Sequence, residues 1–171
     1  MKPSAQDYLN RIRLDEVIST IRILSRRNEH PESPPRNGGV LSITVVAVSD
    51  VATTSLAATS VGNPGGKIHT YAFNAHEKLR RLYTRRKVGK EDVAASQSAD
   101  NENVFGGAIY FLASNADVYI SLSGAPPKVD EAIAFVLGEK LGLTGPKEYR
   151  NVLLDDAREL LAHVILPYID P

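Results

Sequence analysis

The sequence predicts an α+β protein, in which helices flank a mainly antiparallel sheet. Two pairs of β-rich runs carry this prediction. Residues 40–48 are nearly all apolar and β-branched, which predicts a central strand covered on both faces. They are followed by a Thr/Ser/Ala-rich run at 53–61, while 105–112 and 118–122 flank a short polar turn at Ser114-Asn115. The second hairpin leads through Ser123-Gly124-Ala125-Pro126-Pro127 into a helical pattern. The element order is helix, strand, strand, helix, loop, strand, strand, helix, helix, which is typical of a layered α+β domain.

Four segments show helical periodicity: 4–27, 67–86, 127–141 and 147–166. In the first, Leu9 and Ile12 fall off the apolar stripe, so we expect either a bend or break near Arg13 or first turns that contact a second surface. The third has Pro127 in its first turn and Gly142 as a stop signal. The second is predicted to bury an apolar stripe that consists of Ile68, Tyr71, Ala72, Ala75, Leu79, Leu82 and Tyr83. The last is predicted to bury Tyr149, Val152, Leu153, Leu160, Leu161 and Val164.

Three segments are predicted to be loops. Residues 28–39 hold three prolines and His30, which we expect to be solvated. Residues 62–66 are rich in glycine, but they lack the lysine and hydroxyl ending of a phosphate-binding loop and are interpreted as a turn. Residues 88–104 are mostly polar and form a long loop of the kind that often covers a site.

Composition narrows the classes of function. The 20 basic and 20 acidic residues balance, so the total charge does not favour nucleic acid or an anionic membrane as a partner. The absence of cysteine excludes disulfides, thiolate catalysis and cysteine-based metal sites. No run approaches the roughly 20 apolar residues that cross a bilayer, and the first residues lack a signal-peptide core. We therefore expect a cytoplasmic protein with a single domain over residues 1–171.

The second helix carries the candidate binding residues. His69 and His76 are seven residues apart, roughly 10 Å along the axis, which is too far to share one metal ion. Either could serve alone as an axial ligand to a heme or as a donor in a pocket, but a histidine at the edge of an apolar stripe is more often a packed boundary residue, which is the interpretation that we favour. The helix then ends in six basic residues, Lys78, Arg80, Arg81, Arg85, Arg86 and Lys87, which complement the helix dipole or form an anion site.

Residues from about 14 to 143 resemble a known family. The Ser123-Gly124-Ala125-Pro126-Pro127 corner followed by Asp130-Glu131-Ala132, together with Asn63-Pro64-Gly65-Gly66 before a helix and Phe105-Gly106-Gly107 before a strand, is similar to the GlcG/HbpS-type heme-degrading domains, which also occur at the C-terminus of PduO proteins. That resemblance implies a profilin-like fold, homo-oligomers and, in some members, binding of heme or a corrinoid. The chain departs from the family at Asn74-Ala75, where a Lys-Ala pair is usual, and in the additional helix at 147–166.

Two functions remain open at this stage. The first is an accessory protein that binds a tetrapyrrole or similar ligand between the second helix and the 105–107 turn, through His69, Tyr71, His76, Arg80, Phe105, Gly106 and Gly107. The second is a non-catalytic scaffold, because the helix-strand-strand-helix order also resembles the roadblock-type adaptors. An enzyme ranks third, since no nucleophile and base are placed together by a local motif.

Two further expectations concern assembly and the glycine pair. Four amphipathic helices exceed what a sheet of four or five strands can cover, which predicts a homo-oligomer. Gly106 and Gly107 at a strand start require an explanation, because glycine there is less stable than alanine by roughly 0.5 to 1 kcal/mol. The explanation is either backbone geometry, which we favour, or close approach of a ligand.

Overall fold

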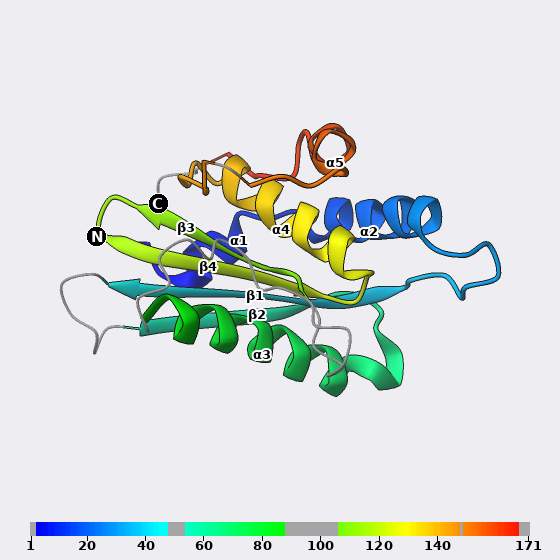
Figure 1. Cartoon of the computed structure of the whole chain (residues 1–171), viewed down its shortest axis with the longest axis horizontal. Coiled ribbons are helices and arrows are strands. Elements are labelled where there is room, and N and C mark those ends of the chain that lie inside the picture. The colour runs from blue at the N-terminus through cyan, green and yellow to red at the C-terminus, as the bar shows by residue number, and fades with distance from the viewer. Residues whose placement is uncertain (1–2, 48–53, 88–105, 148, 168–171) are drawn as a thin grey trace.

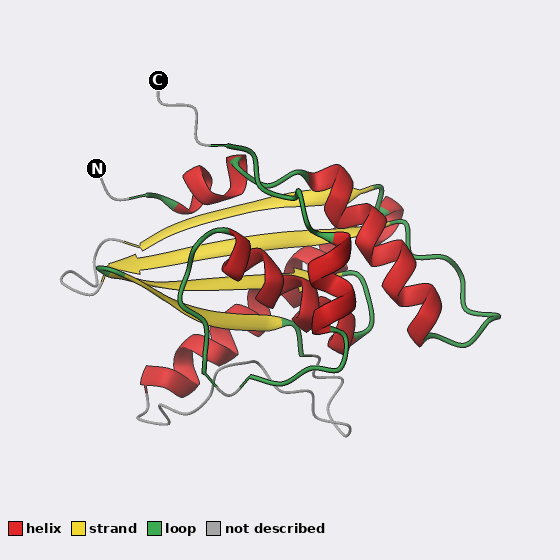
Figure 2. Cartoon of the chain, turned by 90° about the horizontal axis from the view of Figure 1, so that it is seen from above, coloured by secondary structure: helices red, strands yellow, loops and turns green. Residues whose placement is uncertain are grey.

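The computed structural model describes residues 3–47, 54–87, 106–147 and 149–167 (Figure 1). Four antiparallel strands form one sheet in the order β2-β1-β4-β3. Figure 2 shows this sheet from above. The strands are β1 (Gly38–Ala47), β2 (Thr54–Gly62), β3 (Ala108–Ala113) and β4 (Ala116–Ser123). The helices are α1 (Ala5–Asn10), α2 (Leu14–Asn28), α3 (Ile68–Lys87), α4 (Pro127–Lys140) and α5 (Leu154–Leu160), with a 3-10 turn, η1 (Gly65–Lys67), before α3. The predicted layered α+β class is confirmed.

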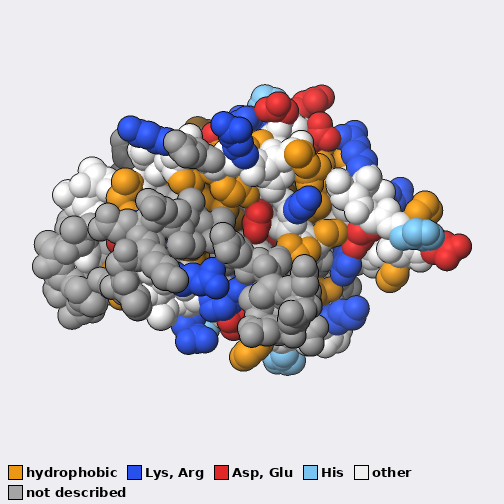
Figure 3. All heavy atoms as spheres, in the orientation of Figure 1, with side chains coloured by type: hydrophobic (Ala, Val, Ile, Leu, Met, Phe, Trp, Pro, Cys, Tyr) orange, Lys and Arg blue, Asp and Glu red, His pale blue; other side chains and the backbone are white. Residues whose placement is uncertain are grey.

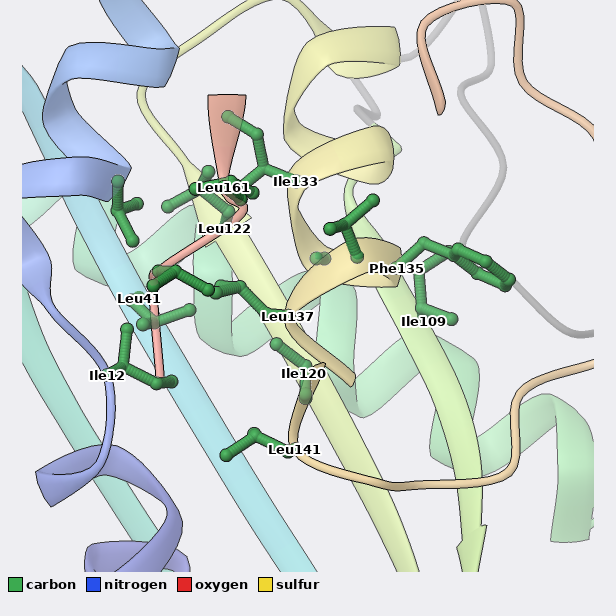
Figure 4. Packing of buried hydrophobic residues seen from close by; sticks show 14 of the residues in the cluster. Ile12, Leu41, Ile109, Ile120, Leu122, Ile133, Phe135, Leu137, Leu141 and Leu161 are labelled. Atoms are coloured by element: carbon green, nitrogen blue, oxygen red, sulfur yellow. The ribbon is translucent and has the colours of Figure 1, made fainter. Parts of the chain in front are cut away.

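The helices lie on both faces of the sheet, with α3 on one face and α1, α2 and α4 on the other (Figure 1). β1 is buried along almost its whole length and lies between β2 and β4, as expected of the most apolar run. The larger core lies on the face of the sheet covered by α1, α2 and α4 and extends to α5. Figure 4 shows Leu41, Ile120 and Leu122 from the sheet beside Ile133 and Leu137 from α4. The smaller core lies under α3 and consists of Val46, Leu79, Leu82, Ala108, Tyr110 and Tyr119, with Tyr83 packed against it.

The first predicted helix is broken at residues 11–13, where the mismatch of apolar periodicity indicated it. Ser4 caps α1 through a reciprocal pair of hydrogen bonds with Asp7. The Arg13 N–H then donates to the carbonyl of Val164 (2.7 Å), and Ile12 forms a β-bridge with Ile165. The break therefore lets the N-terminal segment hold the C-terminal segment, although the two lie far apart in sequence.

The predicted C-terminal helix over 147–166 is wrong in its bounds, since among the described residues of this range only Leu154–Leu160 is helical. Thr144 forms a β-bridge with Leu112, which keeps the chain extended beyond Gly142. The Asn151 side chain then accepts a hydrogen bond from the Leu153 N–H (2.9 Å), which makes a turn in place of a first helical turn. Val152, predicted to be buried, is 86% exposed, whereas Leu153, Leu161 and Val164 are buried as predicted.

The short α5 packs on α2 and α4 and adds a third layer on that side of the sheet. Ala157 is fully buried there, and Leu154 nearly so. Part of the helix surface that was predicted to exceed the area of the sheet is thus covered within the chain, whereas Ile68, Ala72 and Phe73 of α3 are exposed. The homo-oligomer stays a prediction, with less uncovered helix surface to support it than the sequence indicated.

The two edges of the sheet differ. On β3, the Leu112 N–H donates to the carbonyl of Thr144 (2.8 Å) and the Thr144 N–H donates back to Leu112 (3.0 Å), so residues 143–145 cover part of that edge. On β2, the pairing within the described ranges is with β1 alone. Within those same ranges, no helix is long and apolar enough to cross a membrane.

Candidate functional site

The structure does not bring the predicted binding residues together. His69, His76 and Arg80 are exposed on α3, and Tyr71 is half-buried. Gly106 and Gly107 are buried on the inner side of the same helix, while Phe105 lies outside the described residues. The histidines and the glycines therefore belong to opposite sides of α3, and they do not line one pocket.

Gly107 contacts a buried ion pair that the sequence did not reveal. The Lys78 ammonium donates to the Asp130 carboxylate (2.9 Å) and to the carbonyl of Leu122 (2.8 Å), and both charged side chains are only 2% exposed. The backbone of Gly107 has φ +126°, and a Cβ there would lie 2.7 Å from the Lys78 nitrogen and 2.8 Å from the Asp130 Cβ. Backbone geometry and the ion pair thus explain this glycine, as the favoured interpretation predicted, without a ligand.

The ion pair joins the two helix layers. Lys78 comes from α3 and Asp130 from α4, which lie on opposite faces of the sheet (Figure 1). They meet at Gly107, just before β3 begins, where a larger residue would separate them. Burial raises the pKa of Asp130 to about 6, while Lys78 and the N–H groups of Ala125 and Gly124 act in the opposite direction. The N–H of Ala125 donates to the second carboxylate oxygen (3.0 Å), so the Ser-Gly-Ala-Pro-Pro corner is bonded to the same carboxylate.

The basic end of α3 is not a single anion site. Lys78 is buried in the ion pair, Arg81 pairs with Glu77 (2.6 Å), and the guanidinium of Arg86 stacks over the Tyr110 ring at 3.1 Å from its centroid. Tyr110 in turn donates to Asp117 (2.9 Å). These three cations have structural partners, so the hypothesis of an anion site formed by all six residues is not supported by their placement.

The solvent face of α3 carries an exposed stripe that the sequence analysis described only in part. His69, Phe73, His76 and Arg80 follow one another at intervals of four, three and four residues, which places them on one side of a helix. All four are exposed, and Phe73 is 70% exposed. The buried stripe was predicted to begin at Ile68, but Ile68 is 38% exposed and Ala72 is also exposed. The first turns of α3 extend beyond the core, so the stripe begins later in the helix than predicted.

A surface hollow of about 430 Å³ lies beside α5. Its wall includes Tyr149, which stacks on Phe135 (4.6 Å) and donates to Glu131 (3.3 Å), and Arg158, which bonds Glu139 and Asp155. These polar groups bond one another and their neighbours, a pattern typical of structural residues. The hollow therefore has fewer polar groups free to bind a ligand than its volume suggests.

The uncovered side of β2 is the other candidate surface. Thr54, Leu56, Ala58 and Ser60 point to the face on which α3 lies, but α3 packs mainly on the other three strands, and all four residues are exposed. Leu56 is 55% exposed. On the face shown in Figure 3, basic and acidic side chains both occur among the described residues, in keeping with the zero net charge.

Among the described residues, no three His, Asp or Glu side chains are grouped so as to hold a metal ion. Comparisons with protein families, with curated proteins and with solved structures gave no match to this chain.

Proposed function

We propose that this chain is a non-catalytic interaction domain that works by self-association. The observation that carries the proposal is β2, a strand of nine residues without a charge or a proline. Among the described residues its outer edge pairs with no other strand, and its α3-side face is exposed. Proteins that stay monomeric usually protect such an edge with charged residues, proline, a bulge or a covering segment. Here residues 143–145 cover part of the opposite edge, at β3, whereas β2 carries neither a charged residue nor a proline.

The interior supports the same proposal. The charged groups that the fold buries most completely, Lys78 and Asp130, are bonded to each other and to the backbone. A catalytic pair has to reach a substrate, and these two groups are 2% exposed. Their arrangement joins α3 to α4, which is a structural role.

Light scattering of the wild-type chain tests this function. We expect the mass to rise toward twice 18.6 kDa as the concentration rises through the micromolar range, because a small interface gives modest affinity. Added salt should change the mass little, since the proposed surface carries no charge. A mass that stays at 18.6 kDa up to about 100 µM, a concentration far above typical specific dissociation constants, would contradict the proposal.

A second candidate function is the binding of a flat anionic ligand such as heme, and the stripe on α3 favours it. Phe73 offers an exposed ring for stacking, the imidazoles of His69 and His76 are potential iron ligands, and the guanidinium of Arg80 suits a propionate. The stripe is open to solvent, whereas ligand sites usually enclose most of their ligand, so this candidate needs a second surface to cover the ring.

Hemin titration tests this candidate. If the stripe binds hemin, wild type should give a saturable shift of the Soret band, and the double variant His69→Gln/His76→Gln should lose at least tenfold in affinity. His163→Gln is the matched control, since His163 is exposed outside α3. Equal spectra for wild type and the double variant would remove the stripe as a heme site.

A further inference from the structure

The first seven residues of β2, 54–60, are chemically symmetric about Ala57. Read outward from that residue, Ala58 mirrors Leu56, Thr59 mirrors Ser55, and Ser60 mirrors Thr54. Apolar residues thus mirror apolar residues, and hydroxyl residues mirror hydroxyl residues. When two antiparallel copies of one strand are related by a two-fold axis that passes midway between their two copies of residue n, residue i of one copy pairs with residue 2n−i of the other. The order of residues in β2 therefore suits a copy of itself.

From this symmetry we infer that two copies of the chain pair through β2, antiparallel and centred on Ala57, so that their sheets become one continuous sheet of eight strands. The inference deepens the proposed function and rests on it. In this register Leu56 of each copy lies opposite Ala58 of the other on the exposed face. Each Leu56, now 55% exposed, gains an apolar neighbour, and no like charges meet along the strand.

The faces of β2 are compatible with this arrangement. α1 and α2 cover one face, where Ala57 is 6% exposed and the Ala5 N–H donates to the Ser55 hydroxyl (2.9 Å). On the other face the side chains at 54, 56, 58 and 60 are exposed, which leaves room for the cross-strand pairs. Because residues 143–145 cover part of the β3 edge, pairing through β2 closes at two copies and does not continue into a fibre.

Two variants test the surface. Ala58→Lys adds a charge at an exposed position, so the monomer should fold, but each new lysine would lie beside the partner strand and oppose pairing. We expect the dissociation constant to rise at least tenfold. Ala72→Lys is the matched control, because it makes the same change of side chain at an exposed position on α3. It should leave the wild-type mass unchanged.

Cysteine pairing tests the register, and the chain suits it because it has no cysteine of its own. Leu56→Cys and Ala58→Cys are oxidised separately and as a mixture with copper phenanthroline. Residues directly opposite each other have Cβ atoms about 4.5 to 5.5 Å apart, and diagonal neighbours are about 7 Å apart or more. The mixture should therefore form a disulfide-linked dimer several-fold faster than either variant alone.

The outcomes separate the inference from the function that it rests on. A wild-type dimer that Ala58→Lys does not weaken, or that Ala72→Lys breaks, leaves self-association standing and overturns the β2 interface. A mixture of cysteine variants that links no faster than each variant alone overturns the register. A wild-type chain that stays monomeric overturns both.

Discussion

Gly107→Val should destabilise the domain by roughly 3 to 5 kcal/mol, more than any other single glycine substitution proposed here, because strain, overpacking and damage to a buried ion pair act together. The φ of +126° suits glycine, and the new Cβ would lie 2.7 Å from the Lys78 nitrogen and 2.9 Å from the Leu122 carbonyl oxygen. Urea unfolding followed by circular dichroism measures the loss. Gly107→Ala should show most of the same effect, since its Cβ alone makes these contacts.

Two other glycines serve as controls for this result. Gly66 has ordinary φ, and a Cβ there meets no atom within 4 Å, so Gly66→Ala should be close to neutral. Gly65 has φ +57° with the same open surroundings, so Gly65→Ala isolates the backbone cost, about 1 to 2 kcal/mol. If Gly107→Ala costs no more than Gly65→Ala, the ion pair does not depend on the glycine as described.

Lys78→Met should cost about 3 kcal/mol or more at pH 7, because it leaves the Asp130 carboxylate buried without its counter-ion. For a domain of this size that corresponds to a fall in melting temperature of about 10 °C. Lys128→Met on α4 is the matched control, since Lys128 is exposed, and it should change the melting temperature by no more than about 1 to 2 °C.

The pH dependence of this variant identifies the cause. The folded pKa of Asp130, about 6, lies above the ordinary value of 3.8, and loss of the Lys78 charge should raise it further. A raised carboxyl pKa contributes stability that is present below about pH 4 and lost as the pH rises through the folded pKa. The loss in free energy of unfolding caused by Lys78→Met should therefore become smaller as the pH is lowered from 7 to 5. A deficit that is constant over this range would indicate lost packing in place of an unpaired charge.

The fold was predictable where local signals agreed. The β-branched run at 40–48 predicted a central strand, and β1 is central. Pro127 and Gly142 bracketed α4 within two residues of its ends. The C-terminal helix was overpredicted because apolar residues at Tyr149 and Val152 match a helical period by spacing alone, whereas the bridge at Thr144 and the turn at Asn151 are set by tertiary contacts.

The buried ion pair was missed because lysine and aspartate are rarely buried. The sequence held a signal, since Lys78 stands three residues after Ala75 and four before Leu82 on the buried side of α3. Asp130 similarly lies beside Val129 and Ile133 in α4. Two opposite charges on apolar stripes of different helices suggest a pair, but only the fold shows that they meet at Gly107. The exposure of β2 could not be predicted from the sequence either, because a Thr/Ser/Ala-rich composition indicates neither an edge strand nor which face of the strand is left uncovered.

Amide hydrogen exchange at two protein concentrations tests the β2 interface most directly, because it reports on the backbone that would pair. At a concentration where the chain is mostly monomeric and at one where its mass has doubled, the amides of residues 54–60 should differ, with at least tenfold slower exchange of the outward-pointing N–H groups in the dimer. The amides of α3 and β3 should exchange at the same rates in both samples. Protection that appears on α3 instead, or a doubled mass with no change over residues 54–60, would contradict the account.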